Sequence, residues 1–439
     1  MSEVNPRVVK IPNLQKWEFQ SLEQLCSHVG RGTAPRYVEQ SAVKAIGQRC
    51  VSKQGFDSSF ARPHSERALD GTLQAMEGDV LLNSTGTGTI GRSVVFRESG
   101  TFIVDGHVTA LRPKVSKCSS TWLSAVLQSP WGQEHLERFC YAGSTNQVEL
   151  SASALRVSAV PTPSYDEQTK IAEILDTLDS AIRGTEAVVA KLKAMKQGLL
   201  HDLSTRGIDA NGDLRPPQPE APHLYKQTTL GWLPKEWDVH TVRNLAQSSA
   251  IGPFGSDLVA SDYRDEGVPV VFVRDIKPDS FFWKSNVFLT PRKALSLSAH
   301  KVTAGDVVAT KMGFPPCIAA VYPASLPDGI ITADVVCIRV NQNLSFPKWL
   351  SMSLNSHRVQ RQVDQITAGV TRPKVTLRDV RELQIALPDL PEQEVIITRC
   401  SALDDELAIE QQQLEKLRLQ KLGLMDELLT GRKPVTALL

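Results

Sequence analysis

The strongest constraint on this chain is a heptad pattern of about forty residues that occurs twice, at a constant shift of 225 positions. Glu167-Gln168 opens the first copy and Glu392-Gln393 opens the second. The two seams read Leu175, Leu178, Ile182, Thr185, Val189, Leu192, Lys196, Leu199, Leu203 and Cys400, Leu403, Leu407, Glu410, Leu414, Leu417, Lys421, Leu424, Leu428. A narrow apolar seam of this length predicts a coiled coil. Because the helices belong to two copies of one unit, we expect them to pack antiparallel in a pseudo-twofold molecule, with Lys196 opposing Glu410 and Thr185 approaching Lys421.

Length and composition fit a globular protein of two or three domains. The chain has 439 residues, of which 41% are hydrophobic and 22% charged, and a net charge of +1. A nucleic-acid surface would therefore have to be local rather than global. Seven cysteines without a CxxC pair and scattered histidines predict a reducing compartment and no zinc site. The N-terminus lacks a hydrophobic segment, so we expect a cytoplasmic protein.

Each heptad helix follows a region of short strand-like runs cut by Gly and Pro. The sequence predicts an α+β protein, with two globular α/β domains in pseudo-twofold repeat joined by an antiparallel coiled coil. Strands are expected at 79–82, 93–96, 102–104 and 108–111, then at 268–273, 306–310, 319–322 and 335–340, with a helix at 121–139. The expected segments are a first domain 1–163, a helix 164–206, an extended linker 207–232, a second domain 233–388, a helix 389–432 and a tail 433–439.

A glycine-rich motif, Gly86-Thr87-Gly88-Thr89-Ile90-Gly91, matches the GxGxxG pattern of dinucleotide-binding loops. Such a loop needs a helix directly after it, so that the helix N-terminus faces the pyrophosphate. Here the following residues, 92–96, alternate and branch like a strand. The motif therefore predicts a glycine-rich hairpin and no bound cofactor.

The chain carries no recognisable catalytic constellation. An adenine methyltransferase would need a Pro-Pro-aromatic loop, yet Pro216-Pro217 lies in the predicted linker and Cys317 follows Pro315-Pro316. A nuclease would need clustered carboxylates to hold a divalent metal, and the acidic residues are dispersed. We therefore expect neither a catalytic residue nor a metal site.

Residues suited to phosphate and base-edge contacts lie in a few places. The segment 26–67 holds seven Lys or Arg against three acids, and the loops 143–147 and 369–374 carry hydroxyls, amides and cations on tight turns. The candidate DNA-binding residues are Arg31, Arg36, Thr85, Thr87, Thr89, Arg92, Ser144, Thr145, Asn146, Gln147, Ser256, Lys311, Thr371, Arg372 and Lys374.

Taken together, these features resemble the specificity subunit of type I restriction-modification systems. The resemblance covers nearly the whole chain. It is carried by the opening at 234–237, the Gly-Asp-Val strands beginning at Gly78 and Gly305, and the motif Ile251-Gly252-Pro253-Phe254-Gly255-Ser256. The stretches that run from Gly143 and Gly369 through proline-rich turns into Glu-Gln and a long helix are the most specific.

The resemblance implies a non-catalytic subunit with two target recognition domains, each reading one half of a bipartite DNA sequence. The helices would set the spacer and dock two adenine-N6 DNA methyltransferase subunits, and motor and nuclease restriction subunits would complete the assembly. S-adenosylmethionine and ATP chemistry would reside in those partners. Three alternatives stay open at this point: an enzyme with its own site, a coiled-coil scaffold without DNA contact, and a stand-alone DNA-binding protein without a restriction partner.

Overall fold

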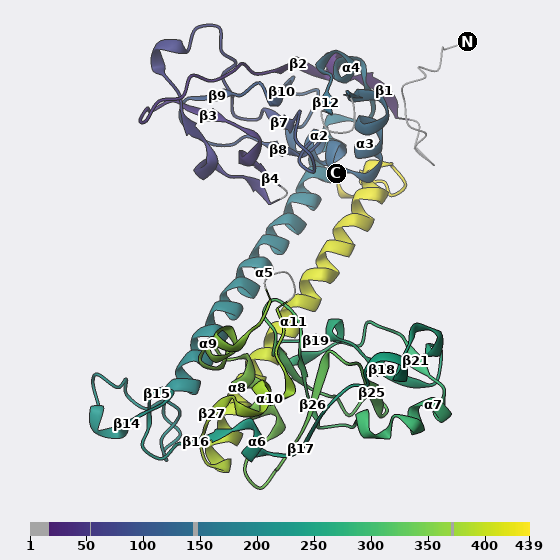
Figure 1. Ribbon diagram of the computed structural model, residues 1–439. Coiled ribbons are helices and arrows are strands. Elements are labelled where there is room, and N and C mark those ends of the chain that lie inside the picture. Colours follow the sequence, from purple (N-terminus) through teal and green to yellow (C-terminus); the bar gives the residue numbers. More distant parts are fainter. Residues whose placement is uncertain (1–16, 53, 144–147, 370–372) are drawn as a thin grey trace. The chain divides into compact units, whose positions relative to one another are not determined.

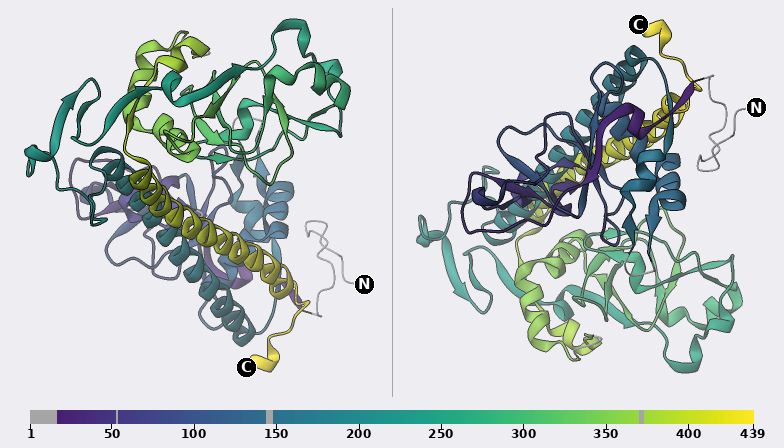
Figure 2. Two further views of the ribbon diagram at one scale, coloured as in Figure 1. Left: turned by 90° about the horizontal axis from the view of Figure 1, so that it is seen from below. Right: turned by 90° about the horizontal axis from the view of Figure 1, so that it is seen from above.

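The computed structural model describes residues 17–52, 54–143, 148–369 and 373–439 (Figure 1). The chain divides into two compact units, the first formed by 1–189 with 410–439 and the second by 190–409. Each unit therefore contains one globular domain and part of both long helices, and within each unit the two helical parts run side by side (Figures 1 and 2).

The first domain is built around an antiparallel four-stranded sheet with the order β2-β10-β7-β8. Its strands are β2 (Cys26–Arg31), β10 (Val108–Pro113), β7 (Val80–Asn83) and β8 (Ser93–Val95). Every residue of β7 is buried, because the strand is covered on both faces. One covering element is α2 (Ser120–Gln128), whose Trp122 is 1% exposed. The predicted strands of this domain are thus present, and β7 and β8 form the predicted hairpin around the glycine motif.

The second domain repeats this sheet with the order β17-β26-β23-β24. The strands are β17 (Ala246–Ile251), β26 (Val335–Val340), β23 (Val307–Thr310) and β24 (Ala319–Val321), and α8 (Pro347–Asn355) packs where α2 packs in the first domain. The order of the four strands is the same in both domains, which confirms two copies of one scaffold.

Smaller sheets extend each domain. In the first domain a three-stranded sheet has the order β6 (Arg62–Pro63), β3 (Lys44–Ile46), β9 (Phe102–Val104). Three further pairs of strands are β1 (Glu18–Ser21) with β13 (Ala159–Thr162), β4 (Val51–Ser52) with β5 (Gly55–Phe56), and β11 (Tyr141–Ala142) with β12 (Glu149–Leu150). In the second domain a four-stranded sheet has the order β21 (Phe288–Leu289), β18 (Val268–Val271), β25 (Gly329–Ile331), β22 (Lys301–Val302). Two further pairs of strands are β16 (Asp238–Thr241) with β27 (Gln384–Leu387) and β19 (Ile276–Lys277) with β20 (Ser280–Phe281). The short helices are α1 (Leu22–Leu25), α3 (Pro130–His135), α4 (Ala152–Val157), α6 (Val242–Leu245), α7 (Pro291–Ser296), α9 (His357–Ile366) and α10 (Leu377–Glu382).

Two buried polar contacts recur in both copies and hold equivalent parts of the scaffold. Asp79 accepts two 2.8 Å hydrogen bonds from Arg112, and Asp306 accepts bonds of 3.0 and 2.8 Å from Arg339. Burial alone would raise the pKa of Asp306, but the hydrogen bonds from Arg339 and Thr303 outweigh it and hold the pKa below its usual value. In the same way Gln168 and Gln393, both fully buried at the start of a long helix, link that helix to its domain. Gln168 accepts a hydrogen bond from the amide of Ser119 at 2.9 Å, and Gln393 accepts one from the amide of Phe346 at 3.0 Å.

The long helices are α5 (Tyr165–Thr205) and α11 (Leu390–Leu429). Every seam position of both heptad patterns is buried or half-buried, whereas most positions between them are exposed. In the first unit Lys421 pairs with Asp179 and Arg418 with Glu186, so the helices run antiparallel. In the second unit Lys196 pairs with Asp404. The predicted antiparallel coiled coil is therefore present.

The predicted polar partners within the coiled coil were wrong. Lys196 bonds to Asp404, not Glu410, and Lys421 bonds to Asp179, not Thr185. The prediction considered seam residues alone, but both aspartates flank the seam, where a long lysine side chain reaches them with its charged end. A shift of 225 residues converts one ion pair into the other, so the contact itself obeys the pseudo-twofold repeat.

Two further expectations need correction. The predicted helix 121–139 is broken after Gln128, because Ser129 caps a new helix that begins at Pro130. Segment 207–232, expected to be an extended linker, folds onto the second domain. It contains β14 (Tyr225–Thr228), which pairs with β15 (Gly231–Pro234), and its sparse apolar residues are used as anchors, with Ile208 3% exposed.

Charge also anchors this segment. Arg215 donates to Glu392 at 2.5 and 3.2 Å, and Trp237 donates its indole N–H to the same carboxylate at 3.0 Å. Gly207 adopts a φ of +62° beside them, where a Cβ would meet the Glu392 carboxylate at 2.2 Å. Gly207, which follows the end of α5, is thus required both by its backbone conformation and by this close approach.

Each domain core also includes residues of the helix that returns from the other copy. Met425, Leu428 and Leu429 of α11 are buried in the core of the first domain. Leu203 of α5 and Ile208 just after it are buried in the core of the second. Each globular domain is therefore completed by a segment remote in sequence.

Candidate nucleic-acid interface

Most of the candidates among the described residues lie at one end of each four-stranded sheet, where β7 or β23 ends, and this end is called the edge of the sheet from here on. In the first domain the amide of Leu150 donates to the carbonyl of Ser84 at 2.8 Å, and in the second the amide of Val375 donates to the carbonyl of Lys311 at 3.0 Å. Thr85 likewise bridges to Glu149, and Met312 to Lys374. The backbone frame of this edge is therefore the same in both domains, while the side chains that it presents differ.

A glycine brings another segment close to the frame in each domain. A Cβ on Gly32 would lie 1.8 Å from the carbonyl oxygen of Val104, and one on Gly252 would lie 2.1 Å from the carbonyl carbon of Thr332. Real side chains never approach backbone so closely. Both glycines therefore fix the path of the chain that follows β2 or β17 along the candidate interface.

In the first domain the charge of Arg31 is neutralised within the protein. Its guanidinium donates to Glu149 at 2.9 Å and to the carbonyls of Leu150 and Ser84 at 3.0 and 3.4 Å. These contacts leave little of the guanidinium free for a phosphate or a base. Although Arg31 was a candidate DNA contact, its geometry is that of a residue that holds Glu149 and Leu150 in place.

Of the three threonines of the glycine hairpin, two bond within the protein and one is exposed. Thr85 is 8% exposed and bonds to Gln48 and to His107, the latter at 3.0 Å. Thr89 donates to backbone carbonyls of its own turn, whereas Thr87 is exposed at the tip. Among these three candidates only Thr87 presents its side chain to an incoming ligand.

The remaining first-domain candidates are Arg36 and Arg92. Arg36 is exposed, with its amide donating to His64 at 3.0 Å, so its side chain can reach a ligand. Arg92 is half-buried and donates to the carbonyl of Gly88 at 2.6 Å, which braces the hairpin. The basic segment 26–67 thus contributes an exposed cation at Arg36, while Arg92 has a structural contact.

Aromatic residues accompany the basic segment, a feature that the charge count overlooked. The Arg62 guanidinium lies 3.6 Å from the ring centroid of Tyr37, and that of Arg49 lies 4.2 Å from Phe60. Burial and the neighbouring Asp105 carboxylate, to which the hydroxyl donates, raise the pKa of Tyr37. Exposed stacks of this kind suit contacts with bases and phosphates.

The second-domain edge carries cations without carboxylate partners among the described residues. The Lys311 ammonium donates to the carbonyl of Ala333 at 3.1 Å and lies 4.8 Å from the ring centroid of Phe254. Lys374 and Ser256 are both exposed. The structure thus brings together Lys311 and Lys374, which the sequence placed 63 residues apart.

Six candidates lie outside the described residues. These are Ser144, Thr145, Asn146, Gln147, Thr371 and Arg372. The described flanks show where their loops attach: one joins β11 to β12, and the other lies between α9 and α10. Of the described residues that follow these segments, Glu149 and Lys374 lie beside the ends of β7 and β23 through their bridges to Thr85 and Met312.

Sequence reasoning missed Gln48, His107 and Phe254, which share the interface with the candidates. Gln48 and His107 surround Thr85 from separate loops, so no local pattern links them. Phe254 does have a signal, because it lies in the Ile251–Ser256 motif and is 56% exposed, unusual for phenylalanine.

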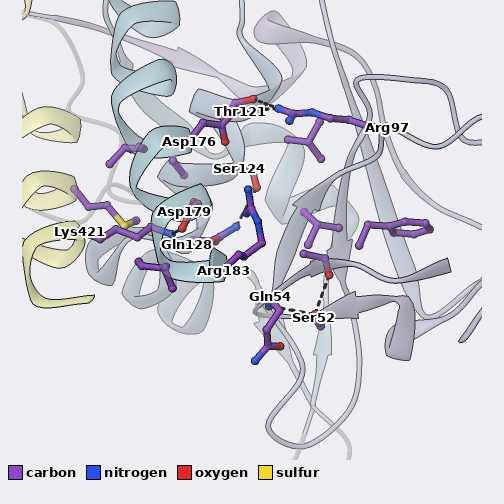
Figure 3. A pocket seen from close by; sticks show the side chains of 18 of the residues that line it. Ser52, Gln54, Arg97, Thr121, Ser124, Gln128, Asp176, Asp179, Arg183 and Lys421 are labelled. Carbon is purple, nitrogen blue, oxygen red and sulfur yellow. Dashed lines mark hydrogen bonds and ion pairs between the residues drawn. The ribbon is translucent and has the colours of Figure 1, made fainter. Parts of the chain in front are cut away.

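A separate cleft in the first unit, with a volume of about 620 Å³, lies between the first domain and the long helices (Figure 3). Charged side chains line it, and six of them form three ion pairs: Arg97 with Asp176 at 3.3 Å, Lys421 with Asp179, and Arg418 with Glu186 at 2.7 Å. Paired charges explain the cleft as a junction that braces the domain against the helices, rather than as a substrate site.

The described residues offer little for metal or covalent chemistry. No group of three or more His, Cys, Asp or Glu among them is placed to hold a metal ion. Burial raises the pKa of the Cys317 thiol to about 12, so this cysteine is not a thiolate nucleophile at neutral pH. No helix in the described part of the chain is long and apolar enough to cross a membrane.

The family model for the type I restriction modification DNA specificity domain matches residues 65–194 and again 234–419. The chain belongs to this family. The two matches correspond to the two copies found in the fold. The first combines the later part of the first domain with most of α5, and the second combines nearly the whole second domain with most of α11.

Individual relatives agree with the family assignment. The chain is 22% identical over 357 residues to a putative type I restriction enzyme MjaX specificity subunit of Methanocaldococcus jannaschii, covering 81% of this chain and 78% of the relative. It is 25% identical to the EcoBI specificity subunit of Escherichia coli, over 59% of this chain and 54% of that protein. The crystal structure of the S subunit from M. genitalium matches with a TM-score of 0.57 at 12% identity, covering 96% and 98% of the two chains. That likeness confirms the fold.

Proposed function

We propose that this chain is the DNA-sequence specificity subunit of a type I restriction-modification complex, without catalysis of its own. Residues 1–163 and 233–388 are proposed as target recognition domains, each reading one half of a bipartite sequence. The helical regions 164–206 and 389–432 are proposed to set the spacer. Acting on DNA, the protein would work in the cytoplasm.

One observation carries this proposal: two identically ordered sheets present chemically different edges. Arg31 and Glu149 neutralise each other at the first edge, whereas Lys311 and Lys374 at the second have no carboxylate partner in the described part of the chain. A duplicated catalytic or structural domain would gain nothing from such divergence. Two readers of different half-sequences require it, because bases are distinguished by the side chains at the reading edge.

The helices supply a surface for the proposed methyltransferase subunits. In the first unit Val188, Leu419 and Leu422 are 42%, 61% and 51% exposed, and in the second Met195 and Ile409 are 49% and 65% exposed. Large apolar side chains on solvent-facing positions of a helix favour partner contact. We propose that two adenine-N6 methyltransferase subunits dock here and that motor and nuclease subunits join through them.

The central test compares DNA binding and methylation with and without this chain. Mapping of methylated adenines in cells that contain or lack the chain should reveal a bipartite motif that depends on it. Gel shifts with the methyltransferase subunits should show specific binding that weakens steeply with salt. Methylation that is unchanged without the chain would refute the specificity role, and binding of S-adenosylmethionine by the isolated chain would favour an enzyme.

The helices can be tested as the ruler that sets the spacer. Four residues inserted between Lys193 and Ala194 would add about 6 Å along α5, and the rise of DNA is about 3.4 Å per base pair. Because the insertion also rotates the seam, we expect the unread spacer to lengthen by about one or two base pairs with both half-sequences unchanged. An unchanged spacer would show that the helices do not set the distance.

A further inference from the structure

The tip of the β23–β24 hairpin in the second domain presents an exposed aromatic ring, Phe314, that has no ring or cation contact among the described residues. Phe314 is 77% exposed, more than any other phenylalanine among the exposed large apolar residues. The equivalent position in the first domain is Thr87, between two glycines. The two domains therefore share the backbone of this hairpin but carry very different side chains at its tip.

The hairpin tip is held firmly on both sides of this ring. The amide of Gly313 donates to the carbonyl of Pro373 at 3.2 Å, and the amide of Cys317 donates to the carbonyl of Thr310 at 2.7 Å. Pro316 and Cys317 are buried directly after the tip. Because both ends are anchored, Phe314 cannot easily fold back onto the domain to cover its apolar surface.

Charge around the tip indicates what covers it. Lys311 precedes Phe314 by three residues, and Lys374 is joined to the hairpin through the bridge to Met312. Among the described residues, neither lysine has a carboxylate partner, and Phe254 adds a second exposed ring beside Lys311. Cations around exposed aromatic rings match a polyanion with stackable faces, which is DNA.

We propose that Phe314 is a wedge that stacks against a base step in the DNA half-site bound by the second domain, partly unstacking that step, while Lys311 and Lys374 hold the flanking phosphates. This inference rests on the proposed function. Apolar side chains that enter between base steps kink the duplex and make flexible steps preferred. The first domain, with Thr87 at the same position, would leave its half-site stacked.

The experiment uses the chain assembled with its methyltransferase subunits on DNA that contains the target. Permanganate and diethyl pyrocarbonate report unstacked thymines and purines in each half-site. With the native chain we expect hyper-reactive bases in the second half-site that disappear with Phe314→Ala and persist with Phe314→Trp. Bases extruded by the methyltransferase subunits react equally with every variant, so the difference between variants isolates the wedge.

A matched control is Leu295→Ala, which removes a side chain that is 76% exposed in the same domain. We expect it to leave affinity and reactivity unchanged, whereas Phe314→Ala should weaken binding of the specific target about tenfold. The inference is overturned if Phe314→Ala binds and reacts as the native chain does, and also if it abolishes assembly with the methyltransferase subunits, since the ring would then be a protein contact. Absence of specific binding by the native assembly would refute the proposed function instead.

Discussion

The sheet edges of the two domains share a backbone frame, but they differ in whether the charged side chains on that frame are paired with opposite charges. At the first edge Arg31 is satisfied by Glu149 and two carbonyls, and the hairpin tip is Thr87 between glycines. At the second edge Lys374 takes the place of Glu149, Lys311 takes the place of Ser84, and Phe314 takes the place of Thr87. The comparison teaches that the buried scaffold is preserved by its internal contacts while the edge is free to change.

The largest effect is expected from exchanging one whole domain. Replacing residues 17–161 with the corresponding domain of a relative should change one half of the recognised sequence completely and leave the other half unaltered, because each edge is built from side chains of its own domain. Methylation mapping of the hybrid measures both halves at once. A change in both halves would mean that the two edges do not read independently.

The next prediction compares equivalent glutamates at the starts of the two long helices. Glu392→Gln removes the carboxylate that pairs with Arg215 at 2.5 Å and leaves this 9% exposed side chain with a 3.8 Å contact to Glu236, so it should lower the free energy of unfolding by about 3–5 kcal/mol. Glu167 caps its own helix through Ser164 at the surface, so Glu167→Gln should cost about 1 kcal/mol or less. Urea denaturation gives both values. Equal costs would show that the folded segment 207–232 adds nothing to the second domain.

Salt dependence separates the two edges directly. If Lys311 and Lys374 neutralise phosphates, each substitution to methionine should reduce the slope of log affinity against log salt by about 0.9. Arg31→Met serves as the matched control, and it should leave the slope unchanged because Glu149 already neutralises Arg31. A reduced slope for Arg31→Met would restore Arg31 as a phosphate contact.

The smallest expected effect concerns pH. The hydrogen bonds from Arg339 and Thr303 keep the pKa of Asp306 below its usual value of 3.8, so the ionised carboxylate stabilises the fold above that pH and its contribution is lost as pH falls through the lowered pKa. Because Arg339 is half-exposed, Asp306→Asn should cost about 1 kcal/mol near pH 7. The difference from the native chain should shrink below about pH 4. A difference that is constant from pH 7 to pH 3 would contradict this account.

The sequence predicted those elements of the fold that a local periodic pattern encodes. The heptad seams located both long helices, and the β-branched runs located most strands of the two central sheets, because period and branching are read within a few residues. The same reasoning failed at 207–232, where few apolar residues suggested an extended linker. Arg215 and Glu392 are 177 residues apart in the sequence and come into contact only in the folded chain, so no local pattern could predict that contact.

The candidate interface shows the same limit. Composition singled out Arg31 as a DNA contact, but its neutralisation by Glu149 depends on a partner 118 residues away. Conversely, Phe314 was not among the candidates, since exposure cannot be read from a single aromatic residue. Sequence therefore identified where the interface lies better than which side chains face outward.

The contribution of α11 to the first core has a consequence for biosynthesis. Met425, Leu428 and Val435 complete a core whose other members come from the start of the chain. A ribosome makes about 250 further residues after 189, which takes roughly 12–50 s at about 5–20 residues per second. The domain that is synthesised first therefore completes its hydrophobic core last. Until α11 leaves the ribosome, the apolar surface that α11 covers stays accessible to proteases and chaperones.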